Sequence, residues 1–571
     1  MQETDQMPRM AQYILVVLAC VWLHQPADAA VLAKTHMAAA AHPLAAEAGR
    51  QILRDGGSAV DAAIAVQAVL GLVEPQSSGI GGGAFLMHWD QAAKQMAAYD
   101  GRETAPAGVT PELFLKPDGQ PLGFREAFTG GRSVGVPGVI AMLALAHRNH
   151  GKLPWTDLFA PAIKLADQGF PVSARLRLMI GAMTKLSEFP EARSLYFTAG
   201  TPPQPLAAGA MLRNPDYAKS LRVIAAGGPQ AFYTGELAQA MVAAVNAQGG
   251  SLSLEDLAHY QAKQRAPLCG AYREYKVCGM PPPTSGGVAV LQILGMLQSF
   301  EMRALAPGSV AGLHLLAQAG RLAYADRGQY LADTDVVEVP LKGLLSPAYL
   351  AERARHITLG QAGPAPVAAG NPKRRAGIDF APGADGAFPS TSHISIIDGQ
   401  GNAVSMTSSV EAPFGSHVMA GGFFLNNQLT DFSFVPVIDG RPVANAAAPG
   451  KRPLSSMSPT LVFDNNGALY ASVGSPGGTR IIGYVAQTLV GLLDWRLDMQ
   501  SAIDLPRLIN RNGPLELEAG TALEKLAPQF TALGHAVEVL PTFSGVQGIR
   551  RVDGMLEGGA DKRREGVALG D

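Results

Sequence analysis

The stretch TSHISIID, residues 391–398, organises this chain. It begins with a hydroxyl residue, Thr391, and continues with alternating polar and apolar residues, a pattern typical of a strand. The residues before it, Gln361 to Pro389, are rich in Pro, Gly and Ala and indicate a loose linker. The turn DGQGN, residues 398–402, separates this strand from a second alternating run. The sequence therefore predicts a hairpin from about Thr391 to Val410.

A threonine that follows a linker suits a chain that cuts itself. A threonine hydroxyl is a poor nucleophile until a base takes its proton, and a threonine at a chain terminus carries such a base in its α-amine. Thr391 gains this amine only if the Ser390–Thr391 bond breaks, through attack of its own Oγ on the Ser390 carbonyl. From the spacing alone, an ordinary hairpin that begins with threonine is the simpler explanation.

The bulk composition excludes several classes of function. The 571 residues are 47% hydrophobic and 16% charged, which allows a sizeable core and several domains or one large multilayered one. A formal net charge of −2 gives no reason to expect nucleic acid or an anionic membrane as a partner. The 12 histidines are scattered, and no metal-binding or phosphate-binding motif is present, so we expect no metal and no cofactor.

The N-terminus resembles an export signal. An apolar run, residues 14–23, follows Arg9, and Ala27-Asp28-Ala29 matches a small-residue cleavage site. The run is too short for a permanent membrane span, and no second long apolar stretch occurs. We therefore expect a signal peptide over residues 1–29, no permanent membrane span, and a periplasmic or secreted location.

Helices and strands are expected on both sides of Thr391. Ser58 and Asp61 resemble a capping box before an apolar helix from Ala62 to Val73, and helical spacing with several breaks runs from residue 138 to 250. The other patterns predict helices over 288–302 and 311–331, a hairpin over 268–280, and strands over 85–89, 461–463, 469–473 and 536–540. This mixture predicts an α/β (α+β) fold with helices on both faces of stacked sheets.

Cys269 and Cys278 flank the turn of the hairpin over 268–280. Export permits a disulfide, and cross-strand positions can meet. Two small apolar thiols fit the pattern equally well, so the sequence leaves both alternatives open.

Two short motifs do not carry the chemistry that they resemble. Residues 131–135 fit G-x-S-x-G, but the segment 124–129 before them is too polar for a buried strand, and Pro137 interrupts the helix that should follow. Residues 79–84 mimic a dinucleotide-binding loop, but they follow a helix instead of a strand. We therefore expect neither a serine hydrolase elbow nor a dinucleotide site.

The motifs around Thr391 and along both halves of the chain resemble those of the γ-glutamyltransferase family, which belongs to the N-terminal nucleophile hydrolases. The matching stretches, in chain order, are residues 81–83, 102–106, 133–138, 281–287, 391–393, 398, 401–404, 414–415, 425–428, 431–433, 451–459 and 474–480. The resemblance covers nearly the whole mature chain. It implies a four-layer αββα sandwich, built jointly by a large subunit (30–390) and a small subunit (391–571) that remain together as a heterodimer.

The resemblance also implies roles for the residues of a catalytic centre. Self-cleavage between Ser390 and Thr391 would free Thr391 as the nucleophile. Ser409 stands where the family has a supporting threonine, and it keeps the hydroxyl. Gly477 and Gly478 would offer backbone N–H groups to the tetrahedral oxyanion.

Five further positions match substrate-binding residues of the family. Arg102 would bind the substrate α-carboxylate, because a planar guanidinium suits a carboxylate, and the Ser455 and Ser456 hydroxyls would assist it. Asp431 and Gln428 would hold the α-ammonium group.

Three features depart from the usual family pattern. Glu411 stands where many members have an asparagine that faces the α-ammonium, and Thr430 stands where an acid is common. The segment between Ser433 and Lys451 is short and has no tyrosine, whereas a typical member has a longer lid that contains one. All three features are similar to the glutaryl-cephalosporin acylase branch of the superfamily.

The resemblance implies a self-processing γ-glutamyltransferase and hydrolase. Such an enzyme cleaves γ-glutamyl amides such as glutathione through an ester on Thr391 and passes the acyl group to water or to an amino acid or peptide. One alternative is an acylase that removes glutaryl-type side chains. A second alternative is an unprocessed binding homologue without catalysis.

Overall fold

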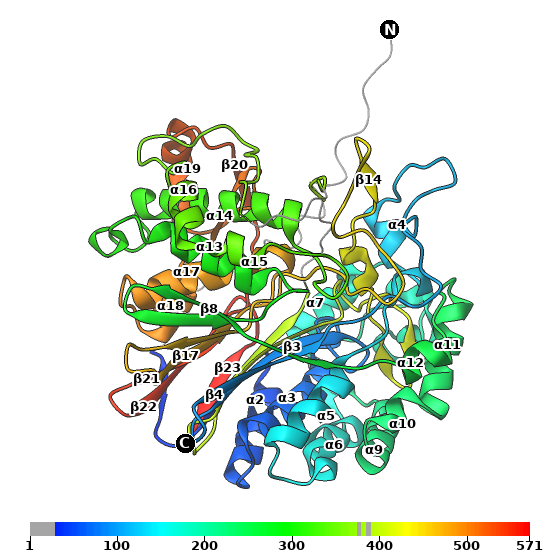
Figure 1. Cartoon of the computed structure of the whole chain (residues 1–571). Helices are drawn as coiled ribbons and strands as arrows, with labels where there is room; N and C mark the ends of the chain where they lie inside the picture. The colour runs from blue at the N-terminus through cyan, green and yellow to red at the C-terminus, as the bar shows by residue number, and fades with distance from the viewer. Residues whose placement is uncertain (1–28, 374–378, 384–389) are drawn as a thin grey trace.

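Two seven-stranded sheets lie face to face, and helices cover the outer face of each, so that the molecule has four layers (Figure 1). The computed structural model describes residues 29–373, 379–383 and 390–571. The architecture confirms the expected αββα sandwich. The predicted signal peptide falls on residues 1–28, outside the described ranges, as do residues 374–378 and 384–389 of the predicted linker. Among the described helices, none combines the length and the hydropathy needed to cross a bilayer.

We call the sheet that contains the predicted hairpin the hairpin sheet and the other the facing sheet. The hairpin sheet has the order β23 (Val567–Gly570), β2 (Met37–Ala40), β10 (Ser392–Ile397), β11 (Ala403–Ser409), β3 (Gly83–Asp90), β4 (Gln95–Gly101) and β7 (Lys263–Arg265). The facing sheet has the order β1 (Val31–Ala33), β22 (Met555–Ala560), β21 (Gln547–Val552), β17 (Leu469–Gly474), β16 (Thr460–Phe463), β9 (Tyr275–Gly279) and β8 (Leu268–Tyr272). Each sheet contains strands from before and after Thr391, so both parts of the chain contribute to the two main hydrophobic clusters.

The predicted hairpin is confirmed as β10 and β11, which pair antiparallel from Ser392↔Ser408 to Ile397↔Ala403. Successive side chains of a strand point to opposite faces of the sheet. Ile394 and Ile396 of β10 therefore pack among the helices, whereas the Ser395 hydroxyl contacts backbone carbonyls of the facing sheet. The polar residues of the alternating pattern thus face a second sheet instead of solvent.

Helices α2 (Pro43–Arg54), α3 (Ala59–Val73) and α5 (Val139–His150) cover the hairpin sheet. The capping box is confirmed, because the Ser58 hydroxyl accepts from the Asp61 N–H and the Asp61 carboxylate accepts from the Ser58 N–H. Every residue of α3 is buried, which explains its nearly continuous apolar sequence. The broken helical spacing after residue 138 continues as α6 (Ala160–Gln168), α7 (Ala174–Ala182), α8 (Pro190–Tyr196), α9 (Pro215–Gly227), α10 (Gln230–Tyr233), α11 (Glu236–Ala247) and α12 (Leu254–Ala258).

Helices α13 (Gly286–Leu297), α17 (Ile481–Leu493) and α18 (Met499–Asp504) cover the facing sheet, and α14 (Val310–Tyr330) packs on α13. The predicted extent of the helix over 288–302 is wrong at its C-terminal end. The Arg273 guanidinium donates to the carbonyls of Leu297, Gln298 and Phe300, so that a side chain from β8–β9 takes the place of a further helical turn. No local pattern within 288–302 carries this signal.

Three smaller questions raised by the sequence have clear outcomes. Cys269 and Cys278 are directly opposed on β8 and β9 and form a disulfide. The strand predicted over 536–540 is β20 (Val537–Leu540), but it belongs to a separate three-stranded sheet with β18 (Leu508–Asn510) and β19 (Leu515–Glu518). Ser133 lies in a 3-10 turn and donates to the carbonyl of Phe128 at 2.7 Å, so it is not a nucleophile elbow.

Candidate active site

Thr391 lies immediately before β10, at the end of the hairpin sheet where β11 also finishes. Its Oγ1 is 2.9 Å from the Oγ of Ser409, the last residue of β11. The Ser409 Oγ accepts a hydrogen bond from the Glu411 N–H at 2.9 Å, which fixes its position. The predicted nucleophile and its predicted supporting hydroxyl are therefore in direct contact, and both are buried.

The neighbouring histidine, His393, makes its hydrogen bonds to residues other than Thr391. His393 lies between the two sheets, where its ring nitrogens are 2.9 Å from the Thr407 Oγ1 and 3.1 Å from the Ser395 Oγ. Burial lowers the pKa of His393 to about 3, so its ring is neutral at ordinary pH. The His393 ring packs against the backbone of Gly474 in the facing sheet. Glycine is required there, because a Cβ at that position would lie 2.2 Å from the His393 ring. The only base that Thr391 could carry with it is its own α-amine, once freed.

A small cavity opens beside Thr391 and collects most of the predicted site residues. It is lined by Arg327, Thr391, Ser409, Glu411, Gln428, Asp431, Leu454, Ser455, Ser456, Met457, Gly478, Thr479 and Ile481. Three predicted residues are outside this set. Ser390 precedes Thr391, and its hydroxyl donates to the Gln76 carbonyl. Gly477 precedes Gly478 in the same turn, and Arg102 lies behind Asp431.

Gly477 and Gly478 form the turn between β17 and α17, and both have positive φ angles, +137° and +59°. A Cβ at Gly477 would lie 2.5 Å from the Tyr484 ring, so the close approach also requires glycine there. The 3-10 turn Gly478–Arg480 leads directly into α17. The first N–H groups of a helix have no acceptor within it, and its N-terminus carries partial positive charge. This turn can therefore stabilise a developing oxyanion beside Thr391.

Glu411 is buried in the wall of the cavity and has a positive φ of +80°. Its carboxylate accepts hydrogen bonds from the Asn427 amide and, at 3.5 Å, from the Thr430 hydroxyl. Burial raises the pKa of Glu411 well above its ordinary value, and the nearby charge of Asp431 raises it further. A cation bound between Glu411 and Asp431 would reverse this effect and favour both ionised carboxylates.

Asp431 is held from behind by a fully buried arginine. The Arg102 Nη2 donates to the Asp431 Oδ2 at 2.5 Å and to the Leu454 carbonyl at 3.0 Å, and the Gln428 Nε2 donates to the same Asp431 oxygen at 2.9 Å. The Arg102 Nη1 is 3.5 Å from Glu103, and burial raises the pKa of Glu103 to about 8. Arg102 thus contacts two elements of the cavity wall without lining the cavity.

The two predicted serines are oriented by groups that sequence reasoning missed. The Ser455 Oγ accepts from the Met457 N–H at 3.1 Å, and the Ser456 Oγ accepts from the Arg327 Nη2 at 3.1 Å. Arg327 lies in α14, and its Nε also donates to the Ser285 Oγ at 2.8 Å. The available signal was an arginine in a long helix that is mostly buried, since a buried charge requires partners.

The glycine run before β3 allows the chain to pass close to the site. A Cβ at Gly82 would lie 2.1 Å from the Ser409 carbonyl oxygen, and one at Gly81 would lie 2.2 Å from the Phe424 carbonyl oxygen. Close backbone approach, not phosphate binding, therefore explains the loop that mimicked a dinucleotide motif. The Asn426 amide further ties this loop to the site through the Gly81 carbonyl.

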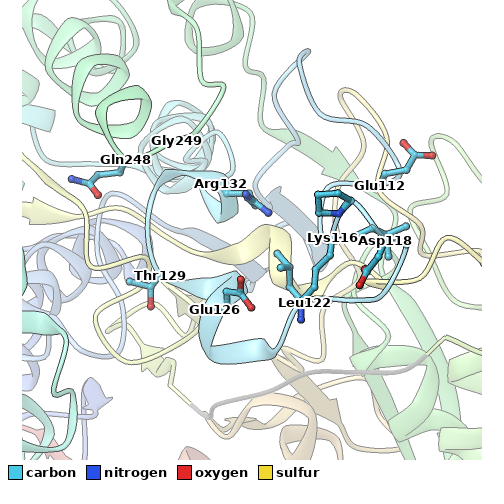
Figure 2. Close-up of a pocket in the computed structure, with 12 residues that line it drawn as sticks. Glu112, Lys116, Asp118, Leu122, Glu126, Thr129, Arg132, Gln248 and Gly249 are labelled. Atoms are coloured by element: carbon cyan, nitrogen blue, oxygen red, sulfur yellow. The ribbon is translucent and has the colours of Figure 1, made fainter.

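A larger cavity lies elsewhere on the molecule, and Figure 2 shows its lining. Glu112, Lys116 and Asp118 come from one loop, Glu126 comes from α4 (Phe124–Phe128), and Arg132 follows it. This cavity shares no residue with the one beside Thr391 and mixes charges of both signs. Within the described ranges, no group of three or more His, Cys, Asp or Glu side chains is placed to hold a metal ion.

Comparison with known proteins agrees with this geometry. The sequence profile of the family described as Gamma-glutamyltranspeptidase matches residues 45–571. A glutathione hydrolase proenzyme of Bacillus subtilis (strain 168) is 37% identical over 94% of this chain and 92% of its own length. An acylase ACY 1 proenzyme of Pseudomonas sp. (strain V22) is 36% identical over 92% of both chains. The crystal structure of cephalosporin acylase from Bacillus halodurans superposes with a TM-score of 0.84 at 29% identity, over 97% of this chain and 98% of that one. The chain therefore belongs to the gamma-glutamyltranspeptidase family of enzymes and has the N-terminal nucleophile hydrolase fold.

Proposed function

We propose that this protein is a self-processing γ-glutamyltransferase and hydrolase that acts on γ-glutamyl amides such as glutathione. One observation carries the proposal. The Thr391 Oγ1 and the Ser409 Oγ lie 2.9 Å apart in the wall of a cavity that also contains Glu411, Asp431 and the Gly478 turn. The proposed nucleophile, the proposed oxyanion site and two acids proposed to hold an ammonium group thus line one small cavity.

The first step makes the enzyme from its precursor. The Thr391 Oγ attacks the Ser390 carbonyl carbon, the C–N bond between the two residues breaks, and the hydroxyl proton passes to the departing nitrogen. Water then opens the resulting ester, which leaves a carboxyl group on Ser390 and a free amine and hydroxyl on Thr391. The names of the relatives as proenzymes support this step.

The second step is turnover. The α-amine of Thr391 takes the proton of its own hydroxyl, the Oγ attacks the γ-carbonyl of the substrate, and the N–H groups of Gly477 and Gly478 stabilise the oxyanion. The amine of the substrate departs with a proton and leaves a γ-glutamyl ester on Thr391. Water, or the amine of an amino acid or peptide, then takes the acyl group.

The acids of the cavity favour a γ-glutamyl over a glutaryl group. A γ-glutamyl group carries an α-ammonium, which Glu411, Asp431 and Gln428 would hold, whereas a glutaryl group has no charge at this position. Without a cation, the buried Glu411 carboxylate would pay a desolvation cost beside Asp431. Ser455 and Ser456 would bind the α-carboxylate, with Arg102 supporting them through the Leu454 carbonyl.

The two cleavage products, residues 30–390 and 391–571, would remain together as a heterodimer, because each sheet contains strands of both. A signal peptide over residues 1–29 would direct the processed enzyme to the periplasm or outside the cell. Neither nucleic acid nor a metal takes part in the proposed reaction.

A second candidate function is removal of glutaryl-type side chains. It is supported by the acylase name of one relative and by the cephalosporin acylase structure that superposes over nearly the whole chain. The third possibility, an unprocessed binding homologue, would leave the contact between Thr391 and Ser409 without a use.

Two measurements separate the candidates. Denaturing electrophoresis and N-terminal sequencing of the purified protein should show fragments of about 361 and 181 residues, the smaller beginning at Thr391. Release of aniline from a γ-glutamyl anilide should be at least about tenfold more efficient than from a glutaryl anilide. A preference for the glutaryl substrate would establish the acylase instead, and a single full-length band in inactive protein would establish the binding homologue.

A further inference from the structure

The bond that must break lies next to a strained residue. Thr391 has a φ of +126°, in the region that only glycine adopts readily. A β-branched residue is especially disfavoured there, and such strain persists only where the surrounding structure imposes it. Ser390, Thr391 and Ser392 are all buried, so packing can hold them in this conformation.

Each of the three junction residues is held by a separate hydrogen bond. The Ser390 hydroxyl donates to the Gln76 carbonyl. The Arg564 Nη1 donates to the Thr391 carbonyl at 2.7 Å. The Ser392 hydroxyl donates to the Glu74 Oε2 at 3.3 Å.

The groups that hold the junction are themselves fixed. Glu74 is fully buried, its N–H caps α3 at Leu70, and its carboxylate lies 3.3 Å from the Arg175 Nε. The Gln76 carbonyl also accepts from the Phe414 N–H at 3.3 Å. The Arg564 guanidinium also donates to the Phe543 carbonyl at 3.2 Å. The junction is thus held between the end of α3 and the loop before β23.

We propose that these three bonds act as a clamp that keeps Thr391 strained and thereby speeds its self-cleavage. The inference rests on the proposed self-processing. The φ angle of Thr391 describes rotation of the Ser390 carbonyl carbon about the N–Cα bond. When that carbon moves from the nitrogen to the Oγ, the constraint on φ ends and the strain is released. The clamp residues are positioning residues for processing and have no part in the turnover that follows.

The chain provides a matched control for one point of the clamp. Ser408 is directly opposite Ser392 in the hairpin, on the same face of the sheet, and is equally buried. Its hydroxyl has no hydrogen-bond partner among the described protein groups. Ser392→Ala and Ser408→Ala therefore remove the same atom from adjacent positions, but only the first removes a clamp contact.

The test follows self-cleavage of newly synthesised full-length chain by pulse-chase and gel electrophoresis. Ser392→Ala should process about tenfold more slowly than wild type, the usual effect of losing a hydrogen bond to a charged group. Ser408→Ala should process within twofold of wild type. Turnover of the γ-glutamyl anilide per processed molecule should be within twofold for both variants. An unchanged processing rate in Ser392→Ala, or equal slowing in both variants, would overturn the clamp.

A second measurement covers the case in which Ser392→Ala folds poorly. Thr391→Gly and Thr391→Ala both block cleavage, but glycine accepts a φ of +126° without strain. The Thr391→Gly precursor should therefore melt a few degrees higher than the Thr391→Ala precursor. The reverse order would overturn the strain. If the wild-type chain is never cleaved, the proposed function itself fails, whereas normal cleavage without these differences refutes the clamp alone.

Discussion

The polar residues on the two faces of the β10–β11 hairpin have different roles. On the face toward the second sheet, Thr391 and Ser409 contact each other beside the cavity. On the face toward the helices, the Ser392 hydroxyl donates to Glu74, and the hydroxyl of its neighbour Ser408 has no hydrogen-bond partner among the described protein groups. One face carries the groups proposed for chemistry, and the other carries groups that hold the backbone in place.

This division follows from the two-residue period of a strand. The Thr391 side chain points to one face of the sheet, and those of Ser390 and Ser392 point to the other. With a nucleophile on the first face, its two neighbours can make hydrogen bonds on the second face that hold the backbone. The comparison predicts that substitutions at the cavity end of the first face alter turnover, whereas substitutions elsewhere on the hairpin alter processing or stability. The variants below test this division, from the largest expected effect to the smallest.

Thr391→Ala should abolish both activities, because it removes the atom that attacks in self-cleavage and in turnover. We expect a single full-length band on a denaturing gel and a loss of at least about 10⁴-fold in kcat for a γ-glutamyl anilide. Detectable cleavage at residue 391, or turnover near the wild-type rate, would remove Thr391 from its proposed role.

Ser409→Ala should lower kcat by about 100-fold, because it removes the hydroxyl that contacts the Thr391 Oγ1 at 2.9 Å. Ser409→Thr keeps the hydroxyl and serves as the control, with kcat expected within about fivefold of wild type. Steady-state kinetics of processed protein checks this prediction. If both variants lose activity equally, packing at this position matters more than the hydroxyl.

Glu411→Gln should raise KM for a γ-glutamyl anilide by roughly 10- to 30-fold, because it removes a charge proposed to face the α-ammonium group. The effect on a glutaryl anilide should be less than about threefold, since that substrate carries no ammonium. Parallel kinetics on the two substrates measures the difference. Equal increases in KM would show that Glu411 shapes the cavity without recognising the charge.

His393→Gln should change stability and not the choice of substrate. The folded pKa of His393 is about 3, below its ordinary value of 6.5, so the neutral ring stabilises the fold above pH 6.5 and this contribution is lost as the pH falls towards 3. Between pH 7.5 and 5.5 the wild type should lose about 1.4 kcal/mol more of its unfolding free energy than the variant. Denaturant unfolding at the two pH values tests this; identical losses would show that the ring takes up its proton without unfolding.

Much of the fold was predictable because its signals are local. The hairpin at Thr391, the capping box at Ser58 and the helix α14 each follow from patterns within one element, and all three are confirmed. The end of α13 was not predictable, because Arg273 of another element provides the partners for its last carbonyls. The same reason explains why Arg327 and Arg564 were missed: each acts through a contact to a residue more than 100 positions away.

The candidate site divides in the same way. The resemblance of its motifs named Thr391, Ser409, Glu411, Gln428, Asp431, Ser455, Ser456 and Gly478, and the fold gathers these around one cavity. It did not show that Arg102 lies behind Asp431, or that the buried Glu103 carboxyl lies next to the Arg102 guanidinium. Those positions depend on how β4 and the turn at Gln428–Asp431 meet, which neither segment encodes alone.

By itself the sequence determined several of the strands and helices and where a hydroxyl residue follows a linker, because hydrophobic period and turn chemistry act over a few residues. The tertiary structure alone decided that the Ser409 hydroxyl contacts Thr391, that Cys269 and Cys278 form a disulfide, and that Thr391 is held at a positive φ. Such contacts join groups far apart in sequence or depend on how neighbouring layers hold the backbone. These contacts form, and stabilise the protein, only once the sheets have stacked and excluded water from between them.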